Sequence, residues 1–278
     1  MQHHPALLLL SAIKFLRIRL AKKLRTMYMN DGIDKERFEE AKKKVIGRDR
    51  QRLGIGTLSE KTVHAVLKNY YEPDEEHQEV PIENYFADIY RAGEIIEIQT
   101  RNFNIMREKL KTFLPLYTVT IVYPIPWEKR LFWINEESGE LSARRKSPAK
   151  GSPYPAFKEL YRIKMFLKNP NLRIKLVFLN MEEYRLLNGW SRDKKKGSVR
   201  YDRIPTELVR EVETACIQDY MQFVPYELQE RFTVKDFAKA AHISVGLAQI
   251  VLHILNYLEI VQRVGRKGKA YLYEAAAF

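Results

Sequence analysis

The sequence predicts a mixed α/β domain followed by a smaller helical domain that ends in a β-hairpin. Apolar residues recur at helical spacing on both sides of a group of short runs rich in Val, Ile, Tyr and Phe. This pattern gives the order helix, three strands, helix, strand between residues 57 and 123. Beyond residue 206, three helical runs precede two short strands. A chain of 278 residues is long enough to form one large and one small domain.

The charge of the chain favours an anionic partner. Its formal net charge is +13, and a positive field attracts polyanions, whose counterions are released on binding. Nucleic acid is therefore the expected partner, although an anionic membrane surface could use the same charge. The single cysteine, Cys216, excludes an intrachain disulfide and a cysteine-built zinc site, and it favours a cytoplasmic setting.

Residues 1–53 are expected to form a basic helical extension. The apolar run in Pro5–Leu20 is far shorter than the roughly 20 residues that a membrane-spanning helix needs. Its positive charges fall within and after the run, unlike those of a secretory signal. We therefore expect a basic amphipathic helix with no stable membrane insertion, and Met27 or Met29 could equally be the natural start. Asp34–Arg52 is charged and poor in apolar residues, which predicts a solvated helix.

Residues 54–188 are expected to form the α/β domain, because periodic apolar runs alternate there with turn signals. The expected elements are a helix capped at Thr57 or Ser59, strands at Gln78–Ile82, Tyr85–Tyr90 and Glu94–Thr100, a helix at Phe103–Phe113, a strand at Leu116–Tyr123, an exposed hairpin within Arg130–Lys150, a helix at Pro155–Leu167 and a strand at Leu172–Leu179. The first six of these elements surround the candidate site.

Residues 189–205 are charged and lack apolar periodicity, so we expect a linker there.

Residues 206–278 are expected to form a winged-helix-like domain. Its predicted elements are helices at Glu207–Tyr220, Val234–Ala240 and Ser244–Leu258, followed by a hairpin around residues 265–268, and Thr233 with Asp236 resembles a capping box. The third helix contains no Lys or Arg, which is unusual for a helix that reads a DNA groove. DNA contact and packing against protein both remain open for this domain.

Two carboxylates are expected to face one another in the hairpin of the α/β domain. Glu97 and Gln99 share one face of their strand, because side chains alternate. If the hairpin turns at residues 92 and 93, Asp88 lies opposite Glu97, with Cβ atoms about 5 Å apart. Opposed like charges destabilise a sheet unless a cation lies between them or one carboxyl keeps its proton. A divalent cation such as Mg²⁺ would resolve the conflict.

The fragments SEKTVHAVL, YFADIY and EIIEIQT, in this element order, resemble the PD-(D/E)XK nuclease superfamily over Thr57–Tyr123. The resemblance implies a restriction-endonuclease-like αβββαβ core and a deoxyribonuclease, expected to be an endonuclease, that depends on Mg²⁺ or Mn²⁺. It implies that Asp88 and Glu97 bind the metal together with the carbonyl of Ile98. It also implies that Glu60, on the preceding helix, holds a water or a second ion, and that a metal-activated water attacks the phosphodiester.

The chain departs from the superfamily pattern at Gln99, where a lysine is usual. Glutamine can donate and accept only neutral hydrogen bonds. Variants with glutamine resemble active members, so Gln99 joins Glu60, Asp88 and Glu97 in the expected catalytic set, and Lys109 on the following helix could supply a displaced cation. For His64, one turn after Glu60, a core or hydrogen-bonding role is expected before a catalytic one.

Basic residues in three segments are expected to contact DNA phosphates. They are Arg144, Arg145, Lys146, Arg192, Lys194, Lys195, Lys196, Arg266 and Lys267.

The first alternative to a nuclease is a catalytically inactive nuclease fold that is a DNA-binding or regulatory protein, and Gln99 is the feature that favours it. A second alternative is a membrane-surface protein that uses the N-terminal basic helix. Cutting of both DNA strands would favour a homodimer.

Overall fold

The computed structural model describes residues 33–52, 61–135, 138–142, 145–188 and 197–276. The chain divides into two compact units, Ile33–Cys216 and a smaller unit whose described part is 217–276. The larger unit is mixed α/β, as the sequence predicts. Its helices and strands follow one another in the order helix, three strands, helix, strand from residue 61 onward.

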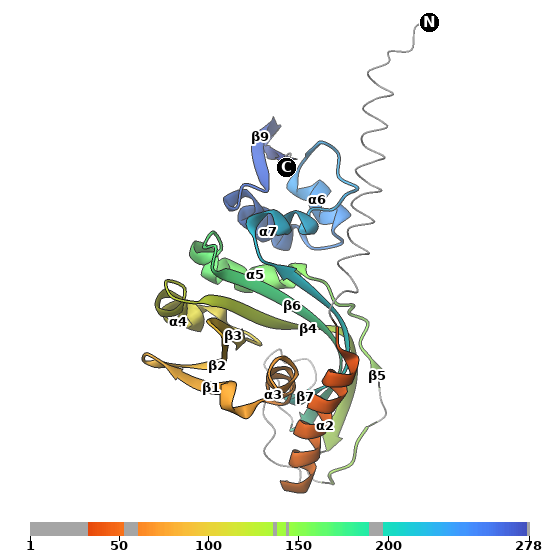
Figure 1. Cartoon of the computed structure of the whole chain (residues 1–278). Helices are drawn as coiled ribbons and strands as arrows, with labels where there is room; N and C mark the ends of the chain where they lie inside the picture. Colours follow the sequence, from red (N-terminus) through yellow and green to blue (C-terminus); the bar gives the residue numbers. More distant parts are fainter. Residues whose placement is uncertain (1–32, 53–60, 136–137, 143–144, 189–196, 277–278) are drawn as a thin grey trace, which may run out of the picture. The chain divides into compact units, whose positions relative to one another are not determined.

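The larger unit contains a seven-stranded mixed sheet (Figure 1). Its strands are β1 (Gln78–Ile82), β2 (Tyr85–Arg91), β3 (Glu94–Ile98), β4 (Thr118–Asn135), β5 (Arg145–Lys146), β6 (Leu172–Leu187) and β7 (Val199–Thr214). Their order is β1-β2-β3-β4-β6-β7, and β5 pairs with β4. The pairs β3–β4 and β4–β6 are parallel, while β1–β2, β2–β3 and β6–β7 are antiparallel.

Helices cover both faces of this sheet. The helices α2 (Lys35–Arg52) and α3 (Lys61–Tyr71) share a hydrophobic cluster with one face, which includes Ile98 of β3 and Val122 of β4. Side chains alternate along a strand, so Glu97 points to the opposite face. There it meets α4 (Met106–Phe113) through Lys109. Near the end of β3, different helices therefore contact the two faces of the sheet: α2 and α3 on the side of Ile98, and α4 on the side of Glu97.

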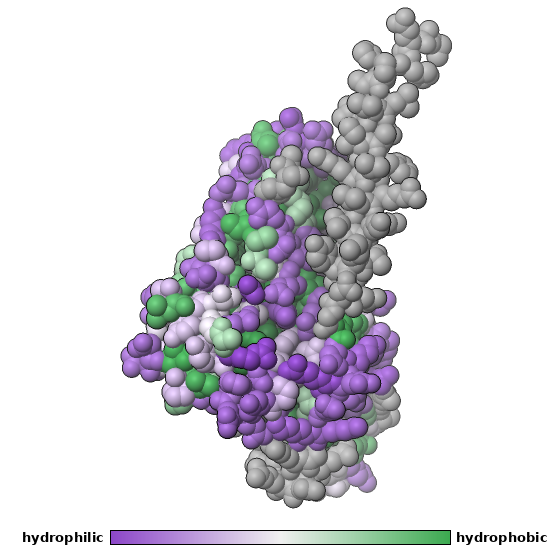
Figure 2. Space-filling model, in the orientation of Figure 1, coloured by the Kyte–Doolittle hydropathy of each residue, from purple (hydrophilic) through white to green (hydrophobic). Residues whose placement is uncertain are grey.

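The expectation of a solvated helix at Asp34–Arg52 is wrong in one respect. The helix α2 exists, but it buries Phe38, Ala41 and Val45 against α3 and the sheet. These three residues recur at helical spacing, and together they form a narrow apolar stripe. The outward side of α2 is charged, and hydrophilic side chains cover this part of the molecule in Figure 2.

The turn between β2 and β3 fixes the register of the candidate site. Ala92 and Gly93 both adopt positive φ angles, 50° and 84°, as the two central residues of a tight hairpin turn with matching twist do. Arg91 therefore pairs with Glu94, and Ile89 pairs with Ile96. The register predicted from the sequence is confirmed.

The sequence prediction fails at the boundary between the two units. The strand β7 begins within the expected linker, at Val199, and covers most of the expected helix at Glu207–Tyr220. Only a short helical turn, Ile217–Phe223, follows it. Because β7 is an edge strand, its many charged side chains can reach solvent, which hid the strand pattern. Pro205 lies at a register shift, where proline is tolerated. The domain boundary therefore lies near residue 216 and not at 205.

Four other expected elements differ from the structure in extent or form. The strand expected to end at Tyr123 continues as β4 to Asn135, and β6 continues to Leu187 instead of Leu179. The expected hairpin within residues 130–150 thus consists of the end of β4 and the two residues of β5. The expected helix at Pro155–Leu167 is broken into the short α5 (Phe157–Leu160) between two 3₁₀ segments.

The smaller unit is built from α6 (Val234–Ala240), α7 (Val245–Tyr257) and three strands, β8 (Arg231–Phe232), β9 (Val261–Lys267) and β10 (Ala270–Ala275), in the sheet order β8-β10-β9. The capping box of Thr233 and Asp236 is confirmed at the start of α6. No single helix in the described ranges is long and apolar enough to cross a membrane, and only α6 with α7, bent by 106°, would pass as a pair.

Candidate functional site

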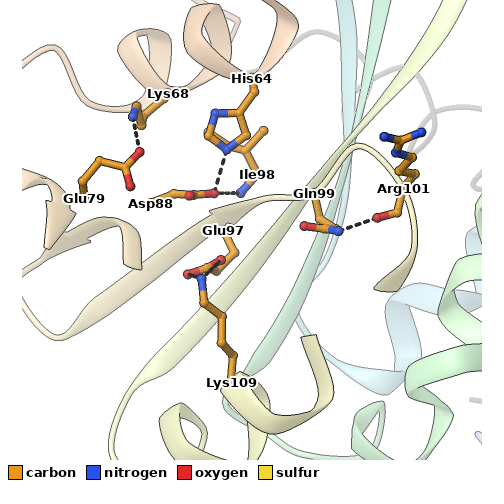
Figure 3. A network of polar contacts seen from close by, with 9 residues as sticks. All are labelled: His64, Lys68, Glu79, Asp88, Glu97, Ile98, Gln99, Arg101 and Lys109. Carbon is orange, nitrogen blue, oxygen red and sulfur yellow. Dashed lines mark hydrogen bonds and ion pairs between the residues drawn. The ribbon is translucent and has the colours of Figure 1, made fainter. Parts of the chain in front are cut away.

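The site lies where β2 and β3 part. Their ladder ends at Ile89 and Ile96, beyond which β2 pairs only with β1 and β3 only with β4. The carboxylate of Asp88 lies in this gap, and its Oδ2 accepts a hydrogen bond of 2.7 Å from the N–H of Ile98 (Figure 3). A side chain thus takes the place of the next ladder bond, which holds Asp88 at the end of the hairpin.

His64 of α3 makes the second contact to Asp88. Its Nε2 lies 3.1 Å from the same Oδ2. Burial alone would raise the pKa of Asp88, but the hydrogen bond and charge of His64, the Ile98 N–H and the charge of Lys109 together lower it. Asp88 is therefore held as a carboxylate, and His64 is a hydrogen-bonding residue of the site and not a core residue.

Glu97 lies beside Asp88 and is almost completely buried, with an exposed fraction of 2%. The Nζ of Lys109 lies 3.1 Å from Oε1 and 2.9 Å from Oε2 of Glu97. Burial and the negative charge of Asp88 raise the pKa of Glu97 to about 7, and the charge of Lys109 opposes this rise. The two neighbouring carboxylates thus repel each other whenever both are ionised, and Lys109 offsets only part of this repulsion at Glu97.

The structure does not bring Gln99 to the carboxylates. Its amide Nε2 donates to the backbone carbonyl of Arg101, away from Asp88 and Glu97 (Figure 3). The cation beside Glu97 is Lys109 instead, on the helix from which the sequence suggests a displaced cation. The catalytic role predicted for Gln99 therefore has no support from its position.

The remaining ligand candidates divide into two groups. Ile98 contacts the site through its N–H, which binds Asp88. Glu60 lies outside the described residues. Within the described ranges, no three His, Cys, Asp or Glu side chains gather into a group that could enclose a metal ion. Asp88 and Glu97 are thus the two carboxylates on which a metal site here would depend.

The residues expected to contact DNA are only partly described. Arg145 and Lys146 form β5 and are exposed, and Lys146 lies 2.8 Å from Glu128. Arg266 and Lys267 end the exposed strand β9. Arg144, Arg192, Lys194, Lys195 and Lys196 lie outside the described residues.

Replacing His64 tests whether it positions Asp88. His64→Ala should lower the free energy of unfolding by about 1 kcal/mol near neutral pH, because Asp88 loses one of its two hydrogen bonds. A depressed carboxyl pKa contributes stability that is lost as the pH falls through that pKa. The difference between wild type and variant should therefore shrink on acidification in urea unfolding. His64→Gln, which retains a donor, should lose less, and equal stability of all three proteins near neutral pH would contradict the contact.

Comparison with known proteins covers most of the larger unit. Residues 61–215 match the family described as "Domain of unknown function (DUF8091)". A protein of Treponema pallidum (strain Nichols), described as uncharacterized, is 31% identical over 150 residues, which are 54% of this chain and 57% of that protein. The chain thus spans little more than half the length of this relative, and no solved structure gives a significant match. Since the family match covers more than half of the chain and includes the whole site from His64 to Lys109, the chain belongs to the DUF8091 family.

Proposed function

We propose that the protein is a metal-dependent DNA nuclease with a restriction-endonuclease-like core. The observation that carries the proposal is the convergence of Asp88, Glu97 and Lys109 at the point where β2 and β3 separate. Like-charged side chains buried together destabilise a fold, and such pairs occur preferentially at functional sites, where a bound cation can offset their repulsion. The element order from α3 to β4 agrees with the αβββαβ order of that core.

The charge and hydrogen bonding of the two carboxylates fit a hard divalent cation such as Mg²⁺ or Mn²⁺. The contacts from His64 and from the Ile98 N–H both use Oδ2 of Asp88, so Oδ1 is not bonded to another described residue. Glu97 is ionised only above about pH 7, because its burial and Asp88 oppose its charge. Mg²⁺ commonly takes one or two carboxylates and keeps several waters, so two protein carboxylates suffice. When bound, such an ion lowers the pKa of water and stabilises charge on a phosphate.

The residues of the chain then have distinct tasks. Asp88 and Glu97 would hold the cation, and His64 with the Ile98 N–H would keep Asp88 ionised and fixed. Lys109 stabilises the ionised form of Glu97, and its positive charge would also attract a phosphate bound to the cation. Glu60, which precedes α3 in the sequence and lies outside the described residues, remains a proposed ligand.

The smaller unit supports a role in DNA binding through its hairpin. The order β8, α6, α7, β9, β10 agrees with a winged helix, but α7 contains no Lys or Arg. The hairpin is basic instead, and the guanidinium groups of Arg263 and Arg266 stack on the ring of Tyr271 at 4.4 and 4.7 Å. Guanidinium groups held in place in this way suit phosphate contacts.

A nuclease fold that binds DNA without cutting it is the second candidate. Two observations favour it: Lys109 is bonded to both oxygens of Glu97, and Gln99 replaces the usual lysine. An incoming metal ion must compete with this ammonium group for Glu97. The two candidates differ in cleavage and agree in binding.

Cleavage assays separate the two candidates. Supercoiled, linear, branched and single-stranded DNA would each be incubated with the full chain and Mg²⁺ or Mn²⁺ near pH 8. The nuclease proposal predicts cleavage of at least one substrate that chelation by EDTA stops. DNA binding without cleavage of any substrate would leave the second candidate in place. Size-exclusion chromatography of the active protein would test the proposed dimer.

Replacing Lys109 should shift the pH dependence of cleavage. Lys109→Gln removes the charge that lowers the pKa of Glu97, so Glu97 should ionise at a higher pH. We expect single-turnover cleavage at pH 7 to fall roughly tenfold to a hundredfold, and the loss to be smaller at pH 9. Lys111→Gln is the matched control, because Lys111 lies on the same helix in an exposed pair with Glu108. If Gln99→Ala reproduced this profile and Lys109→Gln did not, the assignment of the cation would be wrong.

A further inference from the structure

A second group of charged side chains in the larger unit is centred on Glu183 of β6. Glu183 has an exposed fraction of 3%. Its carboxylate lies 3.2 Å from Nζ of Lys129, 3.3 Å from Nη1 of Arg185 and 3.2 Å from Nε of Arg203. Burial would raise the pKa of Glu183, but the charges and hydrogen bonds of Lys129 and Arg203 lower it. Three cations against one carboxylate leave two positive charges in excess.

The three cations differ in how much of their bonding capacity is used. Arg185 uses all three of its guanidinium nitrogens, because Nη1 binds Glu183 while Nε and Nη2 donate to the hydroxyl and carbonyl of Ser198. Within the described ranges, the side-chain nitrogens of Lys129 and Arg203 bond to Glu183 alone, and each side chain is 24% exposed. Arg203 bonds to Glu183 through Nε, which leaves both terminal amino groups with donors for a further acceptor. Lys129 and Arg203 can therefore bind an anion without releasing Glu183.

These cations form part of a larger basic face. Arg145, Leu131, Glu183 and Arg203 are successive cross-strand partners on β5, β4, β6 and β7. Cross-strand partners lie on one face of a sheet, and so do residues two positions apart. This row of four cross-strand partners therefore adds the exposed Arg145 to the three cations around Glu183. Four neighbouring strands at the usual spacing give the row a width of about 14 Å. We call Lys129, Arg145, Arg185 and Arg203 the basic face.

We propose that the basic face binds the phosphate backbone of DNA; this inference rests on the proposed nuclease function and adds a contact surface to it. An extended polyanion fits the width of the face, since duplex DNA carries one charge per roughly 1.7 Å of its axis. Guanidinium groups match phosphate oxygens in a bidentate geometry. Glu183 holds the cations in place before binding, which reduces the entropy lost when they meet phosphate.

The test is fluorescence anisotropy of a labelled DNA duplex with the full chain, in EDTA, at several salt concentrations between about 50 and 200 mM. Lys129→Gln/Arg203→Gln should weaken binding and reduce the slope of log affinity against log salt by about 1.8, for two phosphate contacts. Lys43→Gln/Lys158→Gln removes the same charge from exposed sites on α2 and α5 and should leave the slope unchanged. Lys129→Arg/Arg203→Lys retains the charges and should retain the slope.

The outcomes separate this inference from the nuclease proposal. Equal slopes for wild type and Lys129→Gln/Arg203→Gln would overturn the basic face while DNA binding stands. Loss of binding in the charge-retaining variant as large as in the neutral one would show that the cluster only holds the strands together, and would also overturn it. If the wild-type chain binds no DNA, the proposed function fails first and this inference fails with it.

Discussion

Replacing Asp88 or Glu97 with alanine is expected to abolish DNA cleavage. Each substitution removes one of the two carboxylates on which the proposed metal site depends. We expect the single-turnover rate to fall by a factor on the order of a thousand or more, which corresponds to about 4 kcal/mol of the barrier. Cleavage of supercoiled DNA under saturating enzyme and Mn²⁺ measures this loss directly. Activity retained in either variant would remove that residue from the site.

The same two variants should differ in stability. Asp88→Ala leaves the Ile98 N–H and His64 without their acceptor and should lower the free energy of unfolding by about 2 to 3 kcal/mol. Glu97→Ala relieves a buried charge and should cost less at about pH 8. Because both variants should lose activity although their stabilities differ, unfolding would not account for the loss. A larger destabilisation by Glu97→Ala than by Asp88→Ala would contradict this account of the pair.

Glu97 should make the protein less stable as the pH rises through the range just below neutrality. The folded protein holds the Glu97 proton up to about pH 7, whereas an unperturbed glutamate loses it near 4.5. Between these values the folded state binds more protons than the unfolded state, so the free energy of unfolding falls with rising pH. Its contribution should level off above about pH 7, after a total change on the order of 3 kcal/mol.

Glu97→Gln isolates this effect, since the amide cannot ionise. Near pH 5 the variant and the wild type should have similar free energies of unfolding, and near pH 8 the variant should be more stable. Glu108→Gln, at an exposed position on α4, is the control and should show no such change. Urea unfolding at several pH values measures the difference. A constant difference across the range would mean that the pKa of Glu97 is not raised.

The pairing of Asp88 with Glu97 could be predicted from the sequence because it depends on local patterns. Alternation along β3 and the turn at Ala92 and Gly93 determine the register, and this register brings Asp88 to Glu97. A helix repeat places His64 on the side of α3 that reaches Asp88. The assignment of Gln99 depended instead on a motif position, and its amide donates to the Arg101 carbonyl.

The features that the sequence did not predict depend on long-range pairing. The strand β7 reads as a charged linker and a helix, because its register shifts, at Pro205 among others, interrupt alternation and its edge position tolerates charge. The cluster around Glu183 joins residues from three strands, and no local spacing connects Lys129 with Arg203. Such clusters become visible only when the strand order is known.

Anomalous diffraction from a crystal of the protein soaked in Mn²⁺ at about pH 8, where Glu97 is ionised, tests the central claim most directly. The account predicts an anomalous peak in contact with the carboxylates of both Asp88 and Glu97, with Lys109 moved away from at least one oxygen of Glu97. The peak should be absent from crystals of Glu97→Gln. Density in which Lys109 still bridges both oxygens of Glu97, with no anomalous peak near Asp88, would contradict a metal-dependent nuclease site.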